Sequence, residues 1–216
     1  HNRTQPPPCT LTASIIPLTV DTVTLHSVST MKHTPINHHV SFLTKLQEGS
    51  PKHLWKGMQI DNDGEWILQA IDNGTLLIAH DGSFMPHEDK SLSSAGIVLV
   101  CTQTGHLGSI KLCERTCPLS ASNYRGELIG GLITSHILRV ASLYSSSDKV
   151  THIYCDNMGV IHHASHPDSS TSSKQAQADV LLTFTNNLNI AHLQWQYHHV
   201  QSHLDDTSAF SELSLP

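Results

Sequence analysis

Three acidic residues stand where the sequence could place them together for metal chemistry. Asp81 follows the apolar run Leu76–Ala79, Asp156 follows the apolar run Val150–Cys155, and Glu127 lies just before the apolar stripe of a long helical pattern. Like charges that are brought together cost energy unless a cation compensates them. Carboxylate oxygens suit Mg²⁺ or Mn²⁺ better than Zn²⁺. Together the three acids therefore predict a site for a hard divalent cation.

Each acid also has an ordinary structural explanation when it is taken alone. The pairs Asp81-Gly82 and Asp156-Asn157 are typical of turns after strands. Glu127 would be favoured near the start of a helix, where the helix dipole attracts negative charge. The metal hypothesis therefore depends on elements that bring the three residues to one place.

The pattern from Thr75 onward predicts a mixed α/β sheet flanked by helices. Alternating or continuous apolar runs predict strands, and the first three strands are joined by short connections that favour an antiparallel arrangement. Helical spacing of apolar residues predicts the helices. The expected strands are 75–83, 95–102, 109–115, 150–155 and 190–200, and the expected helices are 122–144, 158–164 and 175–187.

The first part of the chain is less regular. Residues 1–60 are predicted to be an irregular linker or the tail of a preceding domain, with a short helix at 39–46, and residues 61–216 form the folded domain. An amphipathic segment is expected at 55–71. Gly126, in the long helix, is a poor helix former, so we expect a close approach of that helix to the sheet.

Composition restricts the class of protein. With 216 residues, 38% of them hydrophobic, the chain can bury one core. A net charge of −6 argues against an autonomous nucleic-acid binder but suits carboxylates that hold cations. Five scattered cysteines indicate a reduced, intracellular protein of the cytoplasm or nucleus. No apolar run approaches the roughly 20 residues of a membrane span, so we expect no membrane contact. We also expect a monomer.

Four segments resemble, in order, the successive motifs of the ribonuclease H family. They are Asp81-Gly-Ser83, Asn123-Tyr-Arg-Gly-Glu127-Leu, Tyr154-Cys-Asp156-Asn157 and His199-Val-Gln-Ser-His203. The nearest likeness is to ribonuclease H domains of retroelement reverse transcriptases, and it covers residues 76–206. The resemblance implies a ribonuclease-H-like fold, with a five-stranded mixed sheet whose first three strands are antiparallel.

The resemblance also implies a function. The family hydrolyses the RNA strand of RNA–DNA hybrids with two Mg²⁺ ions about 4 Å apart, and Mn²⁺ is a possible substitute. By likeness, Asp81 would bridge both ions, Glu127 and Asp156 would each complete one side, and His203 would assist proton transfer or product release. Asn157 and main-chain N–H groups would contact the RNA 2′-OH. The expected partners are the hybrid and neighbouring domains of a larger polyprotein.

The chain departs from the family pattern at its end. The family carries a fourth metal-binding Asp on a final helix, whereas Asp205 and Asp206 follow His203 too closely to be that residue. We therefore expect the fragment to be truncated before the fourth acid. The alternative is an inactive ribonuclease-H-like fragment that acts as a nucleic-acid-binding or spacer module.

Two alternative hypotheses about the site depend on other residues. A transposase or integrase would need a Glu on a helix after Asp156, but the helix at 175–187 offers only Asp179. A zinc site would need His162, His163 and His166, or His198, His199 and His203. Adjacent residues of a strand point to opposite faces, so His198 and His199 would not easily bind one ion.

Overall fold

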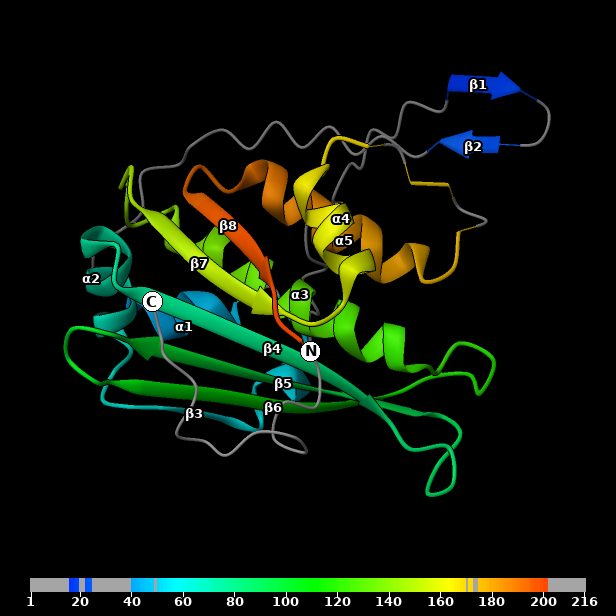
Figure 1. The fold of residues 1–216 in the computed structure, drawn as a ribbon, viewed down its shortest axis with the longest axis horizontal. Helices are drawn as coiled ribbons and strands as arrows, with labels where there is room; N and C mark the ends of the chain where they lie inside the picture. Colours follow the sequence, from blue (N-terminus) through cyan, green and yellow to red (C-terminus); the bar gives the residue numbers. More distant parts are fainter. Residues whose placement is uncertain are drawn as a thin grey trace, which may run out of the picture.

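A computed structural model describes residues 16–19, 22–24, 40–48, 50–169, 171–172 and 175–201 (Figure 1). None of the helices in this described part is both long and apolar enough to cross a membrane. The strands are β1 (Ile16–Thr19), β2 (Thr22–Thr24), β3 (Met58–Ile60), β4 (Leu76–Phe84), β5 (Leu92–Cys101), β6 (Leu107–Arg115), β7 (Val150–Cys155) and β8 (Gln194–His199). The helices are α1 (Phe42–Gln47), the 3₁₀ helix η1 (Lys52–Trp55), α2 (Glu65–Asn73), α3 (Asn123–Ala141), α4 (Met158–Ser165) and α5 (Ala178–Ile190).

The main sheet confirms the predicted fold class. Its six strands lie in the order β3-β6-β5-β4-β7-β8. The neighbours from β3 to β4 are antiparallel, whereas β4, β7 and β8 run parallel. The predicted antiparallel meander is therefore β4-β5-β6, and the two later strands join it through helical crossovers, as parallel neighbours must. Strands β1 and β2 pair separately as an antiparallel two-stranded sheet.

The prediction of five strands missed β3. The segment 55–71, expected to be amphipathic, contains the end of η1, then β3, and then α2. Three residues are too few to show an alternating pattern. A glycine makes the pairing of β3 with β6 possible, because a Cβ at Gly57 would stand 2.0 Å from the carbonyl oxygen of Lys111. Gly64, at φ 77°, then adopts the left-handed conformation that starts α2.

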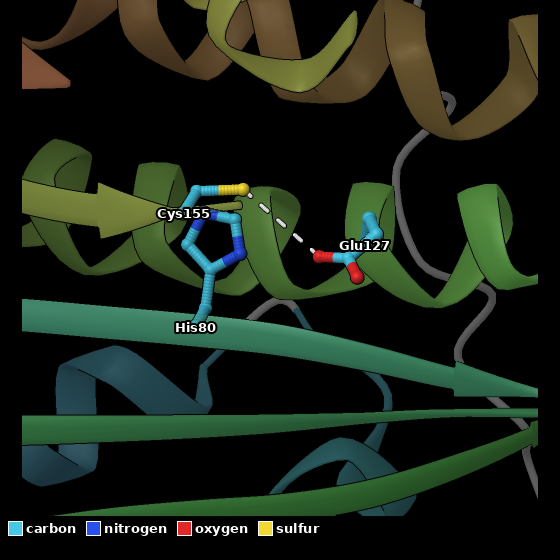
Figure 2. Close-up of side chains that lie close together, drawn as sticks. All are labelled: His80, Glu127 and Cys155. Atoms are coloured by element: carbon cyan, nitrogen blue, oxygen red, sulfur yellow. Dashed lines mark hydrogen bonds between the residues drawn. The ribbon is translucent and has the colours of Figure 1, made fainter. Parts of the chain in front are cut away.

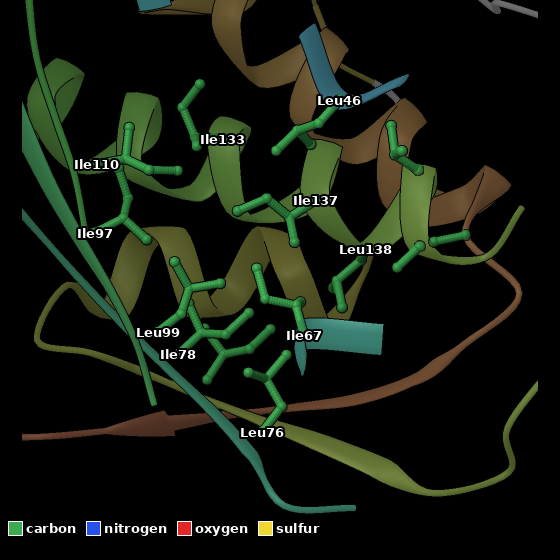
Figure 3. Packing of buried hydrophobic residues seen from close by; sticks show 14 of the residues in the cluster. Leu46, Ile67, Leu76, Ile78, Ile97, Leu99, Ile110, Ile133, Ile137 and Leu138 are labelled. Atoms are coloured by element: carbon green, nitrogen blue, oxygen red, sulfur yellow. The ribbon is translucent and has the colours of Figure 1, made fainter. Parts of the chain in front are cut away.

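The hydrophobic core lies between the sheet and the helices that cover one of its faces (Figure 3). Alternate residues of the central strands point into this layer, among them Leu76 and Ile78 of β4, and α3 contributes Ile133 and Ile137 from the other side. The opposite face remains open to solvent at Val98, which is 45% exposed. Helix α3 is buried along most of its length, because it lies between the sheet and α5.

Part of the region predicted as a linker belongs to this core. Phe42 and Leu46 of α1 are fully buried, and α1 contacts α3. Strand β3 extends the main sheet. The described residues between 42 and 60 therefore pack with the folded domain. The assignment of residues 1–39 to a linker or preceding domain stays a prediction, since most of them lie outside the described residues.

The closest contact between α3 and the sheet is made by two glycines. A Cβ at Gly82 of β4 would lie 2.2 Å from the main-chain nitrogen of Glu127. A Cβ at Gly126 of α3 would lie 2.5 Å from the carbonyl oxygen of Ser94 in β5. These distances are far below van der Waals contact, so the first turn of α3 touches the sheet backbone to backbone. The close approach expected from Gly126 is confirmed.

This contact gives the first prediction. Gly82→Ala should lower the free energy of unfolding by about 3 kcal/mol or more, because the added methyl group meets rigid backbone rather than a movable side chain. Urea denaturation followed by circular dichroism measures the loss.

Gly96→Ala is the matched control. Gly96 lies in the neighbouring strand β5, and its Cβ would meet no atom within 4 Å. Its substitution should leave stability unchanged or slightly raised, because alanine loses less backbone entropy on folding. Equal losses in the two variants would contradict the proposed backbone contact.

Candidate metal centre

The strand register brings Asp81 and Asp156 to the same height. Strands β4 and β7 pair in parallel, and the last paired residues are Ala79 and Tyr154. Asp81 and Asp156 each follow two residues later: Asp156 comes directly after the end of β7, whereas Asp81 lies inside β4, which continues to Phe84 in its pairing with β5. Carboxyl ends of adjacent parallel strands are a common position for functional groups in α/β sheets. The expected juxtaposition of these two acids is therefore a direct result of the parallel pairing.

The glycine contact adds Glu127 to the pair. Each of the three residues offers a carboxylate oxygen, and these oxygens all lie within 4.8 Å of one another. Asp81 is exposed, Asp156 is half-buried, and Glu127 is only 1% exposed. No lysine or arginine of the described chain forms an ion pair with any of them. The three negative groups thus form a set that a cation could neutralise.

The electrostatics of Glu127 reflect this crowding. Burial, followed by the charges of Asp156 and Asp81 and a hydrogen bond with Asp81, raises the pKa of Glu127 from an ordinary 4.5 to about 8. A hydrogen bond from the main chain of Gly82 opposes the rise. In the absence of a cation, Glu127 therefore retains a proton at neutral pH. A divalent ion would favour its ionised form.

An arginine two residues earlier fixes the start of α3. Arg125 is 5% exposed, and its guanidinium donates from Nε and Nη2 to both carboxylate oxygens of Glu114, at 2.8 and 3.1 Å. It also donates to Asp179 at 2.9 and 3.2 Å and to the side chain of Gln177. Burial disfavours its charge, but the hydrogen bonds and charges of Glu114 and Asp179 outweigh burial and raise the pKa of Arg125. The side chain therefore joins α3 to β6 and to the start of α5.

The same contacts decide the transposase or integrase alternative. Asp179, the acid on the later helix that a third ligand would require, is paired with Arg125. That ion pair and its hydrogen bonds lower the pKa of Asp179. It is not among the described carboxylates that lie close to Asp81. Within the described structure, the third acid of the set is Glu127.

A pocket of about 700 Å³ opens at the three acids. Its lining includes Asp81, Glu127 and Asp156, together with Tyr154 and Val98 from the solvent-exposed face of the sheet. Val200 and Gln201, which follow β8, also line it. A substrate could therefore reach the acids from the open face of the sheet, along β4 and β5.

The remaining residues predicted for the site are not part of the group of three acids. His203, Asp205 and Asp206 lie outside the described residues, so their predicted roles are untested. The side-chain oxygen of Asn157 caps α4 by accepting hydrogen bonds from the main chains of Gly159 and Val160, at 3.0 and 3.2 Å. The contact with a substrate 2′-OH predicted for Asn157 would then be made by its amide nitrogen, and it stays a prediction.

The proposed histidine zinc sites find no support among the described residues. His162 and His166, at the end of α4, have tilted rings with centroids 4.8 Å apart, but no third ligand among the described residues completes a group with them. His198 accepts or donates a hydrogen bond with His152 at 2.9 Å, whereas His199 lies against the carbonyl oxygen of Asp156 at 3.1 Å. Adjacent residues of β8 thus have different partners, as strand geometry requires.

Two residues near Glu127 were not anticipated from the sequence as part of a site. His80 and Cys155 are both buried, and with Glu127 they form a second group whose ligand atoms lie within 4.8 Å of one another. Cys155 lies in an apolar run, where a cysteine usually acts as a small hydrophobe. His80 gave a usable signal, because a histidine occupies a position of β4 whose alternation with Leu76 and Ile78 requires a buried side chain.

Comparison with known proteins gives only distant likenesses. No family model matches the chain, and no curated protein matches it. Among solved structures, LC11-RNase H1 in complex with RNA/DNA hybrid is 8% identical, with a TM-score of 0.44 over 59% of this chain and 86% of that one. RNase H1 from the halophilic archaeon Halobacterium salinarum NRC-1 is 13% identical, with a TM-score of 0.41 over 61% and 89%. An N-terminal RNase H domain from Mycobacterium tuberculosis, solved as a fusion with maltose-binding protein, is 15% identical, with a TM-score of 0.39 over 61% and 85%.

The fold is ribonuclease H-like. From β4 to β8, the chain has the expected succession of three antiparallel strands, a helix, a parallel strand, two helices and a last parallel strand. The sheet differs from the expected one only by the added edge strand β3. The ribonuclease H-like elements are those that hold Asp81, Glu127 and Asp156.

The raised pKa of Glu127 predicts a pH-dependent stability. In metal-free buffer the folded state keeps this proton up to about pH 8, whereas the unfolded chain loses it near pH 4.5. The folded state therefore binds more protons between these values, so its stability should fall as the pH rises from 4.5 to 8 and level off above. Glu127→Gln removes the ionisable group. The variant should gain stability relative to the wild type across this range, as urea denaturation in EDTA at pH 5, 6.5 and 8 can measure.

The exposed Glu88 provides the control for this experiment. Glu88→Gln should follow the wild-type pH profile. If the stability of Glu127→Gln and of the wild type changed with pH in the same way, the raised pKa of Glu127 would be contradicted.

The contacts of Arg125 predict that even a substitution by lysine lowers the stability of the fold. Arg125→Lys keeps the positive charge but loses the planar fork that binds both oxygens of Glu114, so stability should fall by about 2 kcal/mol. Arg115→Lys is the matched control, because Arg115 is 72% exposed in its pair with Asp89 and should cost less than about 1 kcal/mol. Thermal or urea unfolding of both variants measures the two losses of stability. Equal losses would show that Arg125 acts only as a surface charge.

Proposed function

We propose that this chain is a metal-dependent nuclease that hydrolyses the RNA strand of RNA–DNA hybrids. One observation carries the proposal: the acids Asp81, Glu127 and Asp156 lie within 4.8 Å of one another at the mouth of a pocket. They are also the acids of the three sequence segments that resemble ribonuclease H motifs. The fold alone would not support this function, since one fold hosts many activities.

The donor set fits hard divalent cations. All three side chains present oxygen atoms, which Mg²⁺ and Mn²⁺ prefer. The crowding that raises the pKa of Glu127 is relieved when a cation lies among the acids. We propose that Asp81, Glu127 and Asp156 would together hold two Mg²⁺ ions. When bound, such ions activate water and stabilise the leaving oxygen.

The protein's own groups prepare this site. The glycine contact fixes Glu127 against β4, and Arg125 holds the helix start in place. The exposed carboxylate of Asp81 lines the pocket. A bound divalent cation there would lie between this carboxylate and a phosphate group of the substrate. His199 of the fourth motif ties the end of β8 to the carbonyl oxygen of Asp156 at 3.1 Å. His203, four residues later in the sequence, is proposed to assist proton transfer or product release.

The choice of hybrid substrate and the wider context are also proposals. Recognition of the RNA strand would use its 2′-OH groups, which distinguish RNA from DNA. Main-chain N–H groups remain candidates for that contact. The net charge of −6 disfavours strong binding of nucleic acid by this chain alone. We therefore propose that neighbouring domains of a retroelement polyprotein supply part of the affinity.

Cleavage of labelled duplexes tests this function. With Mg²⁺, the wild type should cut the RNA strand of an RNA–DNA hybrid and leave DNA duplex and RNA duplex of the same sequence intact. Asp81→Asn should lower the rate at least a hundredfold, because loss of a direct ligand exceeds the 10–100-fold cost typical of residues behind the ligands. Circular dichroism should show that its fold is unchanged.

Asp148→Asn is the matched control. Asp148 is exposed and lies before β7, at the opposite end of that strand from Asp156. This variant removes the same charge and should cleave at the wild-type rate. Full cleavage by Asp81→Asn would refute the proposed site. Metal binding without cleavage by the wild type would instead favour an inactive nucleic-acid-binding or spacer module.

A further inference from the structure

A second group of possible ligands lies beside the carboxylates. His80 of β4, Cys155 of β7 and Glu127 of α3 are each less than 5% exposed, and their ligand atoms lie within 4.8 Å of one another. In Figure 2 the His80 ring points from β4 toward the Cys155 side chain, and the sulfur of Cys155 points toward the carboxylate of Glu127. The Cys155 thiol donates a long hydrogen bond of 3.9 Å to Oε2 of Glu127. The group contains one nitrogen, one sulfur and one oxygen ligand.

His80 is the residue that the hydrophobic core does not explain. Neither of its ring nitrogens has a hydrogen-bond partner within the described chain. An unsatisfied buried polar group costs about 1–3 kcal/mol. Burial lowers the pKa of His80 to about 4, so the ring is neutral at physiological pH and keeps a free lone pair. An apolar side chain would fill the same space without this cost.

The surroundings make room for the His80 ring. A Cβ at Gly130 of α3 would lie 2.8 Å from Nδ1 of His80 and 3.1 Å from its Cβ. Helix α3 therefore has no side chain where the ring lies. On the other side, the ring of Tyr197 contacts His80 edge-on, with centroids 5.8 Å apart. The ring is thus held in a fitted position with its nitrogen atoms unpaired.

The pocket provides an entry path. His80 and Glu127 both line the 700 Å³ pocket that opens at Asp81 and Asp156. An ion attracted by these acids would meet Glu127 first, and then the nitrogen and sulfur ligands behind it. Water from the same pocket could complete its coordination.

We propose that His80, Cys155 and Glu127 form a binding site for Zn²⁺. Nitrogen and thiolate ligands select a borderline ion such as Zn²⁺ over Mg²⁺. The site is distinct from the set Asp81, Glu127 and Asp156, but it shares Glu127 with that set. Zn²⁺ in this site therefore competes for Glu127 with the ions required for cleavage, a consequence that rests on the proposed nuclease function.

Binding involves a proton exchange. The Cys155 thiol releases its proton to solvent as a sulfur–zinc bond forms, and Glu127 releases the proton that it holds in the metal-free state. His80 is already neutral and donates a lone pair. Burial and the nearby carboxylates raise the pKa of the Cys155 thiol to about 12 in the metal-free protein, and the ion replaces the proton there. Affinity for Zn²⁺ should therefore increase with pH.

Cobalt provides a spectroscopic test that does not depend on nuclease activity. Co²⁺ commonly replaces Zn²⁺, and a thiolate ligand gives it a sulfur-to-metal charge-transfer absorption in the near ultraviolet. The reduced wild-type chain titrated with Co²⁺ should develop this band, and Zn²⁺ should displace it. His80→Phe and Cys155→Ala should each abolish the band. Both substitutions keep apolar volume in the core, and circular dichroism verifies the fold.

Two controls separate Cys155 from the other cysteines. Cys101 is also buried, but it pairs with Leu76 at the opposite end of β4, so Cys101→Ala should retain the band. The exposed pair Cys113 and Cys117 can be replaced together by serine, and this variant should also retain it. Absence of the band in the wild type, or its persistence in Cys155→Ala, would overturn the proposed site.

Inhibition of cleavage tests the competition for Glu127. One equivalent of Zn²⁺ should reduce Mg²⁺-dependent hybrid cleavage by the wild type at least about tenfold, which corresponds to 1.4 kcal/mol. The ratio of rates with and without Zn²⁺ should return close to one in Cys155→Ala, measured against the variant's own rate. Equal inhibition of both proteins would refute the competition. If the wild type cleaves nothing, the nuclease proposal fails, while the cobalt band still decides whether the site exists.

Discussion

The backbone contact between Gly82 of β4 and the first turn of α3 determines the rest of the site. A Cβ at Gly82 would lie 2.2 Å from the nitrogen of Glu127, so no other residue type fits without displacing the helix. Asp81 precedes Gly82, and Glu127 follows Gly126, so the glycines that allow the contact also place the two acids together. The parallel partner β7 then adds Asp156 through its register.

This arrangement is electrostatically costly without a cation. Three carboxylates lie together, one of them nearly fully buried, and Glu127 retains a proton because ionisation there is unfavourable. The protein must compensate this cost elsewhere, and the buried layer between the sheet and α3 is the main candidate. Arg125 adds a polar anchor, since it joins the start of α3 to β6 and α5. Functional sites often conflict with stability in this way, and a bound cation would remove the conflict.

Much of this organisation could be predicted from the sequence, but not all of it. Long apolar strands such as β4 and β7, and the helical spacing of α3, indicated their elements and therefore the fold class. Gly126 indicated a close approach to the sheet. Strand β3 was missed because three residues carry too little pattern. The roles of Arg125, His80 and Cys155 were missed because they depend on partners 11 to 75 positions away in the sequence, such as Glu114 for Arg125 and Cys155 for His80. Local pattern contains no information about such pairs.

The most direct test of the central claim is a crystal of the chain soaked with Mn²⁺ and measured near the manganese absorption edge. Anomalous density should lie among the carboxylates of Asp81, Glu127 and Asp156, within coordination distance of all three residues, and it should disappear in Asp81→Asn. Manganese bound elsewhere, or carboxylates too far apart to share an ion, would contradict the claim that the glycine contact and the strand register build a metal centre.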